Sequence, residues 1–124
     1  MTPVRTLIVD DHAGARFLIR AIVADAAVDV EVVGEADGAE TALAQLEALA
    51  PDVVVLDARM PRVDGFEAAP LLLERRPDLA VVMCSALVDD DLRARALAAG
   101  AVDVVSKDRI DELPGIVLRA AGRA

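Results

Sequence analysis

Five short apolar segments, each followed by a segment of helical character, restrict the fold of this chain more than any other feature of its sequence. Each apolar segment holds three to six residues, a length typical of strands that are buried on both faces. The predicted strands are residues 7–9, 30–35, 53–57, 79–84 and 102–105. The predicted helices are residues 12–24, 39–49, 66–76, 89–99 and 111–121.

This alternation of strands and helices predicts an α/β fold. Buried strands that alternate with helices form a parallel sheet with helices on both faces, and the crossovers between the strands are right-handed. A single reversal of the winding direction favours the strand order 2-1-3-4-5. We therefore expect a doubly wound (βα)5 fold of the flavodoxin-like type, a three-layer sandwich around one parallel five-stranded sheet. Segment 30–35 alternates apolar with charged residues, which places it nearer the sheet edge.

The length and composition of the chain fit one folded domain. Its 124 residues suffice for a single hydrophobic core, and we assign residues 1–124 to one domain. Hydrophobic residues make up 56% of the sequence but aromatic residues only 2%, so the core must be aliphatic. In the predicted helix 12–24, the side chains of Phe17, Leu18, Ala21 and Ile22 lie on one side, which we expect to be its apolar face.

Charge and cysteine content argue against several classes of protein. The net charge of −9 argues against direct nucleic-acid binding, which requires clustered Lys and Arg, and against docking to anionic membranes. Cys84 is the only cysteine, so no intramolecular disulfide can form, and we expect a cytoplasmic setting. No signal peptide is evident, and no apolar run approaches the roughly 18 residues that a membrane span requires.

Polar residues follow four of the five predicted strands. Asp10 and Asp11 end the first strand, Asp57 ends the third, Ser85 follows the fourth and Lys107 follows the fifth. These four strands are consecutive neighbours in the order 2-1-3-4-5. Because ligands of such sheets bind at the carboxyl edge where the winding direction reverses, we expect all five side chains to converge beside Asp57.

The converging groups predict phosphoryl chemistry. Three crowded carboxylates repel one another and need a cation, and an all-oxygen site suits Mg²⁺ or Mn²⁺. Such a metal, together with the ammonium group of Lys107, neutralises an incoming phosphoryl group. Asp57 is then the nucleophile that forms an acyl phosphate, and the hydroxyl of Ser85 can donate a hydrogen bond to a phosphoryl oxygen.

Over its whole length the chain resembles the receiver domains of bacterial two-component response regulators. The resemblance is carried by an acidic pair after the first strand, by an Asp-x-x-Met-Pro-x-x-Asp-Gly motif after the third, and by a Ser-Ala pair and a lysine seven residues after a glycine. These residues are Asp10, Asp11, Asp57, Met60, Pro61, Asp64, Gly65, Ser85, Ala86, Gly100 and Lys107. The combination is highly specific for this family.

The resemblance implies a role for each residue at the sheet edge. Asp57 is the phospho-acceptor, supplied by a histidine kinase, a phosphotransfer protein or a small phosphodonor. The ligands of Mg²⁺ are Asp11, Asp57 and the backbone carbonyl of Arg59, and Asp10 assists mainly through water. In this reading the domain assists its own phosphorylation and dephosphorylation but is not itself an enzyme.

The resemblance also implies how the signal leaves the site. Ser85 and Lys107 contact the phosphoryl group and report its presence. The output surface, which meets a downstream partner or output domain, consists of the predicted elements 89–99, 102–105 and 111–121. Dimerisation of the phosphorylated form is a further expectation.

Two alternatives stay open at this level. Val104 stands where family members usually carry Tyr or Phe, so the chain can also be a degenerate receiver that only binds protein partners. A haloacid-dehalogenase-like phosphatase also forms a phosphoaspartate on a parallel sheet, but it requires an Asp-x-Asp arrangement, and here Arg59 stands two residues after Asp57. His12 is expected to be a first-turn helix residue beside the acidic pair.

Overall fold

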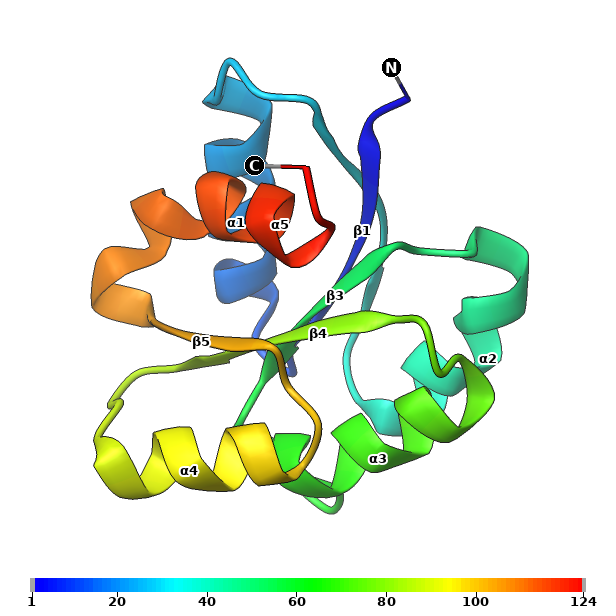
Figure 1. Ribbon diagram of the computed structural model, residues 1–124, viewed down its shortest axis with the longest axis vertical. Helices are drawn as coiled ribbons and strands as arrows, with labels where there is room; N and C mark the ends of the chain where they lie inside the picture. Colours follow the sequence, from blue (N-terminus) through cyan, green and yellow to red (C-terminus); the bar gives the residue numbers. More distant parts are fainter. Residues whose placement is uncertain (1, 124) are drawn as a thin grey trace.

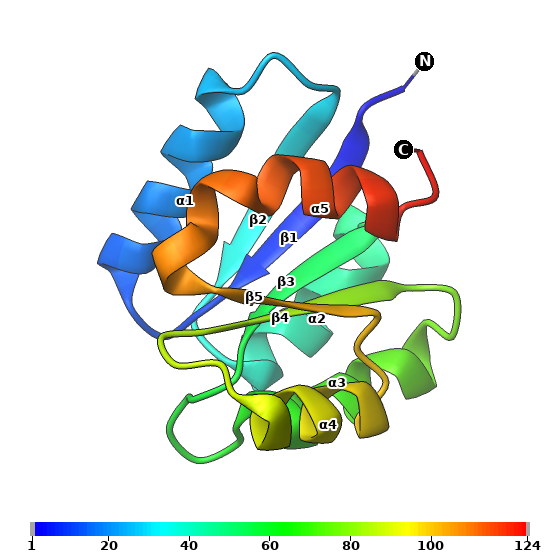
Figure 2. The same cartoon turned by 60° about the vertical axis from the view of Figure 1, so that its left-hand side comes forward.

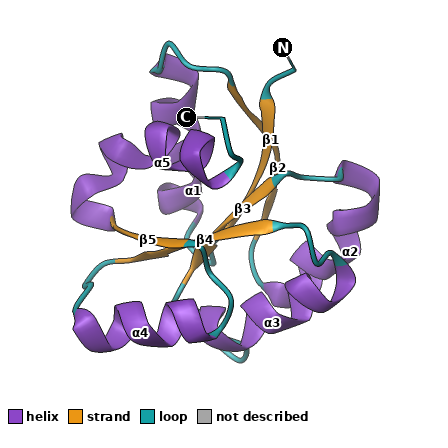
Figure 3. Ribbon diagram, in the orientation of Figure 1, coloured by secondary structure: helices purple, strands orange, loops and turns teal. Residues whose placement is uncertain are grey.

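The computed structural model describes residues 2–123 and has one five-stranded sheet between two layers of helices (Figures 1 and 3). All strand pairs are parallel and the strand order is β2-β1-β3-β4-β5, which confirms the predicted fold class. No helix within residues 2–123 is both long and apolar enough to cross a bilayer. The elements are β1 (Val4–Val9), α1 (Ala13–Asp25), β2 (Val30–Ala36), α2 (Ala39–Leu49), β3 (Val53–Asp57), α3 (Gly65–Arg75), β4 (Ala80–Ser85), α4 (Asp90–Ala98), β5 (Asp103–Ser106), the 3-10 helix η1 (Lys107–Glu112) and α5 (Leu113–Ala120).

Two hydrophobic clusters cover the two faces of the sheet. The side chains of β3 alternate between them: Val54 and Leu56 join the cluster under α2, α3 and α4, whereas Val53 and Val55 join the cluster under α1 and α5. Figure 2 shows these two groups of helices on opposite sides of the sheet. Burial on both faces explains why β3 reads as a continuous apolar run. In contrast, β2 pairs only with β1 and is mostly half-buried, as expected for an edge strand.

The apolar face predicted for α1 is wrong for Phe17, Leu18 and Ala21, whereas Ile22 packs partly against the core. Ile19 and Val23 are the buried residues of this helix, whereas Phe17 is 74% exposed and Leu18 is 50% exposed. Apolar side chains surround much of α1, so hydrophobicity alone does not select the stripe that faces the sheet. The stripe is set by how the helix packs against β1, β2 and α5.

Alanine substitutions on α1 test this assignment. We expect Ile19→Ala to lower the free energy of unfolding by about 2–5 kcal/mol, because it leaves a cavity in a packed core. Phe17→Ala, one of the largest apolar truncations available on the same helix, should change it by no more than about 0.5 kcal/mol. Urea unfolding of both variants measures the two effects, and the reverse ranking would contradict the structure.

The carboxyl-terminal helix also differs from its prediction. Residues 111–121 were expected to be helical, but the chain first forms the 3-10 helix η1 and the regular helix α5 begins only at Leu113. Pro114 is compatible with this start, because proline lacks a backbone N–H and is tolerated only in the first turn of a helix. As a result, Lys107 is the first residue of η1 and follows β5 directly.

Helix α4 is attached to the rest of the protein through few side chains. Its buried residues are Leu92 and Ala96. Its amino terminus is capped by Asp89, whose side chain accepts a hydrogen bond from the backbone N–H of Leu92 at 2.8 Å. On the α3 side, the guanidinium of Arg95 lies 4.1 Å from the centre of the Phe66 ring, a cation–π contact between the two helices.

Candidate functional site

Asp57 ends the central strand β3 and is 4% exposed. It pairs with Cys84 of β4, and the backbone N–H of Ala58 donates to the carbonyl of Cys84 at 2.8 Å. The backbone N–H of Gly65 donates to the carbonyl of Ala58 at 3.0 Å, which closes the β3–α3 loop against the strand end. The backbone on both sides of Asp57 is therefore held by hydrogen bonds.

An acidic cluster forms around this residue. Asp10, Asp11, His12 and Asp57 each offer a ligand atom, and these atoms all lie within 4.8 Å of one another. The Oδ1 atom of Asp11 is buried and accepts no hydrogen bond from the described residues, and the nearest basic atom is Nδ1 of His12 at 3.2 Å. Buried polar atoms are normally partnered, and hard divalent cations take carboxylate oxygens as ligands. The residues present therefore fit the Mg²⁺ site that the sequence predicts.

Lys107 supplies the positive charge at this edge. Its Nζ atom lies 2.9 Å from Oδ2 of Asp10 and 3.3 Å from Oδ1 of Asp57, although 97 residues separate it from Asp10 in the chain. Burial alone would lower the pKa of Lys107, but its hydrogen bond to Asp10 and the charges of Asp57 and Asp10 raise it. The lysine is therefore fully protonated at neutral pH and bridges two carboxylates.

Burial of Asp57 opposes its ionisation. The pKa of Asp57 is raised by desolvation and by the charge of Asp10, and this outweighs the opposite effects of Lys107 and of the Arg59 backbone N–H. Above an ordinary aspartate pKa of about 4, the folded protein thus keeps a proton that the unfolded chain has released. Folding binds protons in this window, so the associated stabilisation is lost as the pH rises through the raised pKa.

This linkage predicts the pH dependence of stability without metal. In the presence of a chelator, we expect the free energy of unfolding to decline as the pH rises above about 4.5, and Asp57→Asn should flatten this decline. Glu35 affects stability at a lower pH than Asp57. Burial raises the pKa of Glu35, but Arg20 and Arg16 lower it by more than burial raises it. The stabilisation from Glu35 is therefore lost only as the pH falls through this lowered pKa. Urea unfolding at a series of pH values measures both effects. An equal slope in wild type and Asp57→Asn would exclude Asp57 as the source.

The structure brings the two remaining predicted residues to the same edge. Ser85 is the last residue of β4, is 2% exposed, and follows Cys84, the partner of Asp57 in the sheet. Arg59 lies in the loop two residues after Asp57, and its exposed guanidinium lies 5.9 Å from the centre of the Phe66 ring. Its backbone is thus beside the carboxylate, while its side chain lies toward α3.

The sequence analysis places His12 beside the acidic pair, as the structure does, but it missed Arg16. His12 is the N-cap residue of α1, and its Nδ1 atom lies 3.2 Å from Oδ1 of Asp11. Arg16 donates from Nη1 to the backbone carbonyl of Asp10 at 2.6 Å. The spacing of Arg16 from Asp10 on a helix was a possible signal, but a single sequence does not show which way an arginine points.

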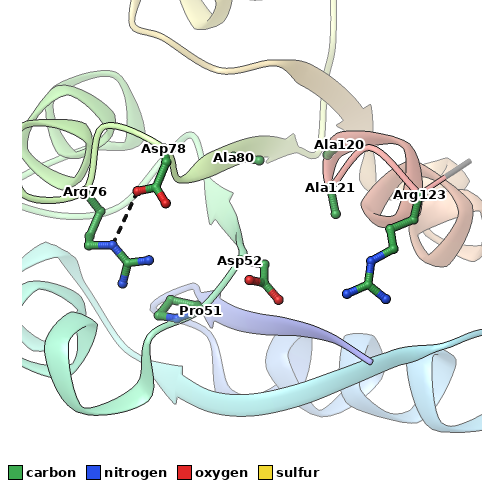
Figure 4. Close-up of a pocket in the computed structure, with 8 residues that line it drawn as sticks. All are labelled: Pro51, Asp52, Arg76, Asp78, Ala80, Ala120, Ala121 and Arg123. Carbon is green, nitrogen blue, oxygen red and sulfur yellow. Dashed lines mark ion pairs between the residues drawn. The ribbon is translucent and has the colours of Figure 1, made fainter. Parts of the chain in front are cut away.

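A polar hollow of about 200 Å³ lies at the amino edge of the sheet, opposite the acidic cluster (Figure 4). Its charged groups already have partners. Arg76 pairs with Asp78 at 3.5 Å, and the carboxylate of Asp52 accepts a hydrogen bond from the backbone N–H of Arg5 at 2.9 Å. The hollow contains none of the residues of the acidic cluster, so we place the functional site at the carboxyl edge.

The fold and the site define a doubly wound α/β protein with a lysine-bridged acidic cluster at the carboxyl edge of its sheet. The family model described as the response regulator receiver domain matches residues 6–117. The chain therefore belongs to this family and is a phosphorylation-switched signalling receiver. This match favours neither the phosphatase alternative nor the degenerate-receiver alternative.

Curated relatives are longer proteins. The chain is 38% identical over 122 residues to the protein-glutamate methylesterase/protein-glutamine glutaminase of group 3 operon of Rhodopseudomonas palustris, covering 97% of this chain and 33% of that protein. It is 44% identical over 117 residues to protein-glutamate methylesterase/protein-glutamine glutaminase 2 of Xanthomonas oryzae pv. oryzae, covering 93% of this chain and 32% of that protein. The chain thus spans about a third of the length of these relatives.

Solved structures show the same fold. The response regulator domain of Thermotoga maritima CheB superimposes with a TM-score of 0.85 at 30% identity, covering 97% of both chains. The signal receiver domain of the putative response regulator NarL from Mycobacterium tuberculosis superimposes with a TM-score of 0.89 at 32% identity, covering 100% of both chains. Both are receiver domains, in agreement with the family match.

Proposed function

We propose that Asp57 is the residue of this receiver that accepts the phosphoryl group. The observation that carries the proposal is the placement of a buried carboxylate beside a lysine ammonium, 3.3 Å away, within a cluster of further carboxylates. A carboxylate oxygen of Asp57 attacks the phosphorus of the donor, the bond from phosphorus to the donor's leaving group breaks, and the leaving group departs with that electron pair. The product is an acyl phosphate on Asp57.

Asp10, Asp11, Asp57 and the backbone carbonyl of Arg59 would hold Mg²⁺, or Mn²⁺ in its place. The bound cation supplies charge neutralisation for the phosphoryl oxygens. The buried Oδ1 atom of Asp11 supports this assignment, because it accepts no hydrogen bond from the described residues, has only Nδ1 of His12 nearby at 3.2 Å, and could take a cation. Asp10 is held by Lys107 and so is suited to act through water.

Lys107 and Ser85 would contact the phosphoryl group once it is formed. Lys107 is already within 3.3 Å of Asp57, so a small movement brings its ammonium to a phosphoryl oxygen. Ser85 lies at the neighbouring strand end and can donate from its hydroxyl. These two contacts would give the phosphorylated site a different arrangement from the free one.

The output would leave through the face formed by α4, β5 and α5. This face carries a hollow of about 280 Å³ lined by residues of all three elements and of η1, among them Arg93, Val104 and Ile116. Because Val104 is small, we propose that the signal moves through the β4–α4 loop and α4 rather than through an aromatic side chain. Upstream, the partner would be a histidine kinase or phosphotransfer protein.

Several finer assignments belong to the same proposal. The domain acts as a phospho-acceptor in the cytoplasm and is not itself an enzyme. Its downstream partner is a protein or an output domain; the matched methylesterase relatives are longer proteins, of which this chain covers about a third. Its phosphorylated form can dimerise, and it does not bind nucleic acid directly, in line with its net charge of −9.

Incubation with a small acyl-phosphate donor tests the proposed chemistry. With Mg²⁺ present, we expect the intact mass to rise by one phosphoryl group, and a chelator should prevent the rise. No gain with Mg²⁺ would overturn the proposal and favour the degenerate receiver. Steady release of phosphate from an external phosphoester, without accumulation on the protein, would favour the phosphatase.

A further inference from the structure

Arg16 connects the acidic pair to the edge strand of the sheet. It lies on α1 and its side chain is 19% exposed. Its Nη1 atom donates to the backbone carbonyl of Asp10 at 2.6 Å, and its Nε atom donates to Oε1 of Glu35 on β2 at 3.0 Å. One guanidinium group therefore joins α1, the end of β1 and β2.

Glu35 is a firm anchor for this guanidinium. Its second carboxylate oxygen accepts from Nε of Arg20 at 2.8 Å, and its backbone carbonyl accepts from the side chain of Gln45 at 3.2 Å. Burial tends to raise the pKa of Glu35, but the hydrogen bonds and charges of Arg20 and Arg16 lower it overall. Glu35 is therefore ionised at neutral pH and fixes the orientation of Arg16.

Arg16 completes the hydrogen bonding of Asp10. The backbone N–H of Asp10 donates to the carbonyl of Ala36 at 3.0 Å. Its carboxylate accepts from the backbone N–H of His12 and from Lys107, both at 2.9 Å. The carbonyl held by Arg16 belongs to the peptide that joins Asp10 to Asp11. The orientation of this peptide sets where the Asp11 carboxylate points, and the Oδ1 atom of this carboxylate accepts no hydrogen bond from the described residues.

We propose that Arg16 is a positioning residue for divalent-cation binding, which it favours by fixing the Asp10–Asp11 peptide. The inference rests on the proposed Mg²⁺ site. A charge-assisted hydrogen bond to a buried carbonyl is among the stronger single contacts in a protein, and its loss removes the contact that holds the Asp10 carbonyl against α1. A misdirected Asp11 carboxylate then binds the cation less well.

If Arg16 acted only through its charge, removing it would change Mg²⁺ affinity in the opposite direction. A positive guanidinium near a cation site repels the cation, so removing its charge should strengthen binding. Arg20 provides the matched control, because it shares the Glu35 carboxylate with Arg16 but is not among the hydrogen-bond donors to Asp10. The two arginines thus separate the effect of charge from the effect of position.

Calorimetric titration with Mg²⁺ alone, without any phosphodonor, tests the inference. We expect Arg16→Met to weaken Mg²⁺ binding at least fivefold, while Arg20→Met leaves it within twofold of wild type or slightly stronger. Arg16→Lys, which keeps the charge but cannot reach both acceptors at once, should weaken it to an intermediate extent. Thermal unfolding with and without Mg²⁺ gives a second readout, in which the Mg²⁺-induced rise of the midpoint is smaller for Arg16→Met.

The possible outcomes are distinct. Wild-type affinity in Arg16→Met, or an equal loss in Arg16→Met and Arg20→Met, would overturn the positioning role. If Arg16→Met does not fold, Arg16→Lys decides, and wild-type affinity in that variant overturns the inference. Absence of Mg²⁺ binding by the wild-type protein would overturn the proposed metal site itself, and this inference with it.

Discussion

Asp57→Asn should abolish phosphorylation of the protein. Asparagine has nearly the same shape as aspartate but no anionic oxygen to attack phosphorus, so the phosphorylated fraction should fall below about 1% of the wild-type level. Intact-mass measurement after incubation with an acyl-phosphate donor and Mg²⁺ quantifies this fraction. Because the substitution also removes a buried charge next to Asp10, the variant should fold at least as stably as the wild type in the absence of metal.

Two further variants test whether the loss of phosphorylation is specific to Asp57. Asp78→Asn removes a carboxylate that is 80% exposed and lies in the opposite hollow, so it should be phosphorylated like the wild type. Asp11→Asn keeps the nucleophile but removes a proposed metal ligand, so it should be phosphorylated slowly and respond less to Mg²⁺. Persistent phosphorylation of Asp57→Asn would place the acceptor on another residue.

Gly65→Ala should be the most damaging glycine substitution tested at this edge. A Cβ atom at Gly65 would lie 2.5 Å from the carbonyl oxygen of Asp57 and 2.9 Å from Cα of Ala58, and both are backbone atoms that cannot turn aside. Overpacking of this kind costs about 1–3 kcal/mol or more. We expect the unfolding free energy to fall by about 3 kcal/mol, and phosphorylation to slow because the backbone of Asp57 is displaced.

Gly14→Ala is the matched control for this prediction. Gly14 lies in the first turn of α1, where an added Cβ meets no atom within 4 Å. Alanine has the higher helix propensity, so this variant should be unchanged or stabilised by up to about 1 kcal/mol. Urea unfolding compares the two variants, and equal losses of stability would contradict the close approach described at Gly65.

The parallel sheet could be predicted from its apolar strands, and the location of the candidate site from the polar residues at the carboxyl ends of those strands. The run from Val53 to Leu56 is apolar on both faces and ends in Asp57, which fixes a buried parallel strand and its carboxyl edge. The strand order places Asp10 and Lys107 at the same edge of the sheet, although two strands lie between β1 and β5. The structure places their side chains 2.9 Å apart.

The features that were not predicted depend on packing rather than pattern. The side of α1 that is buried depends on how the helix packs on the sheet. This packing buries Ile19 and leaves Phe17 exposed. The late start of α5 depends on how the chain leaves β5, and Pro114 limits it only from one side. The bond from Arg16 to Asp10 depends on the direction of one flexible side chain, which no periodicity encodes.

The small number of buried side chains in α4 gives an estimate of the free energy needed to move this helix. Freeing Leu92 from the core costs about 1.5–3 kcal/mol, and freeing the methyl group of Ala96 costs about 0.8 kcal/mol. Coupling free energies between sites in proteins are typically about 1–3 kcal/mol, which is the same range. On the proposed output route, new bonds at the acidic cluster must supply a free energy of this size to move α4. Because only two of its side chains are buried, α4 is an element that can move at a low cost in free energy, even though Val104 offers no large side chain to change its rotamer.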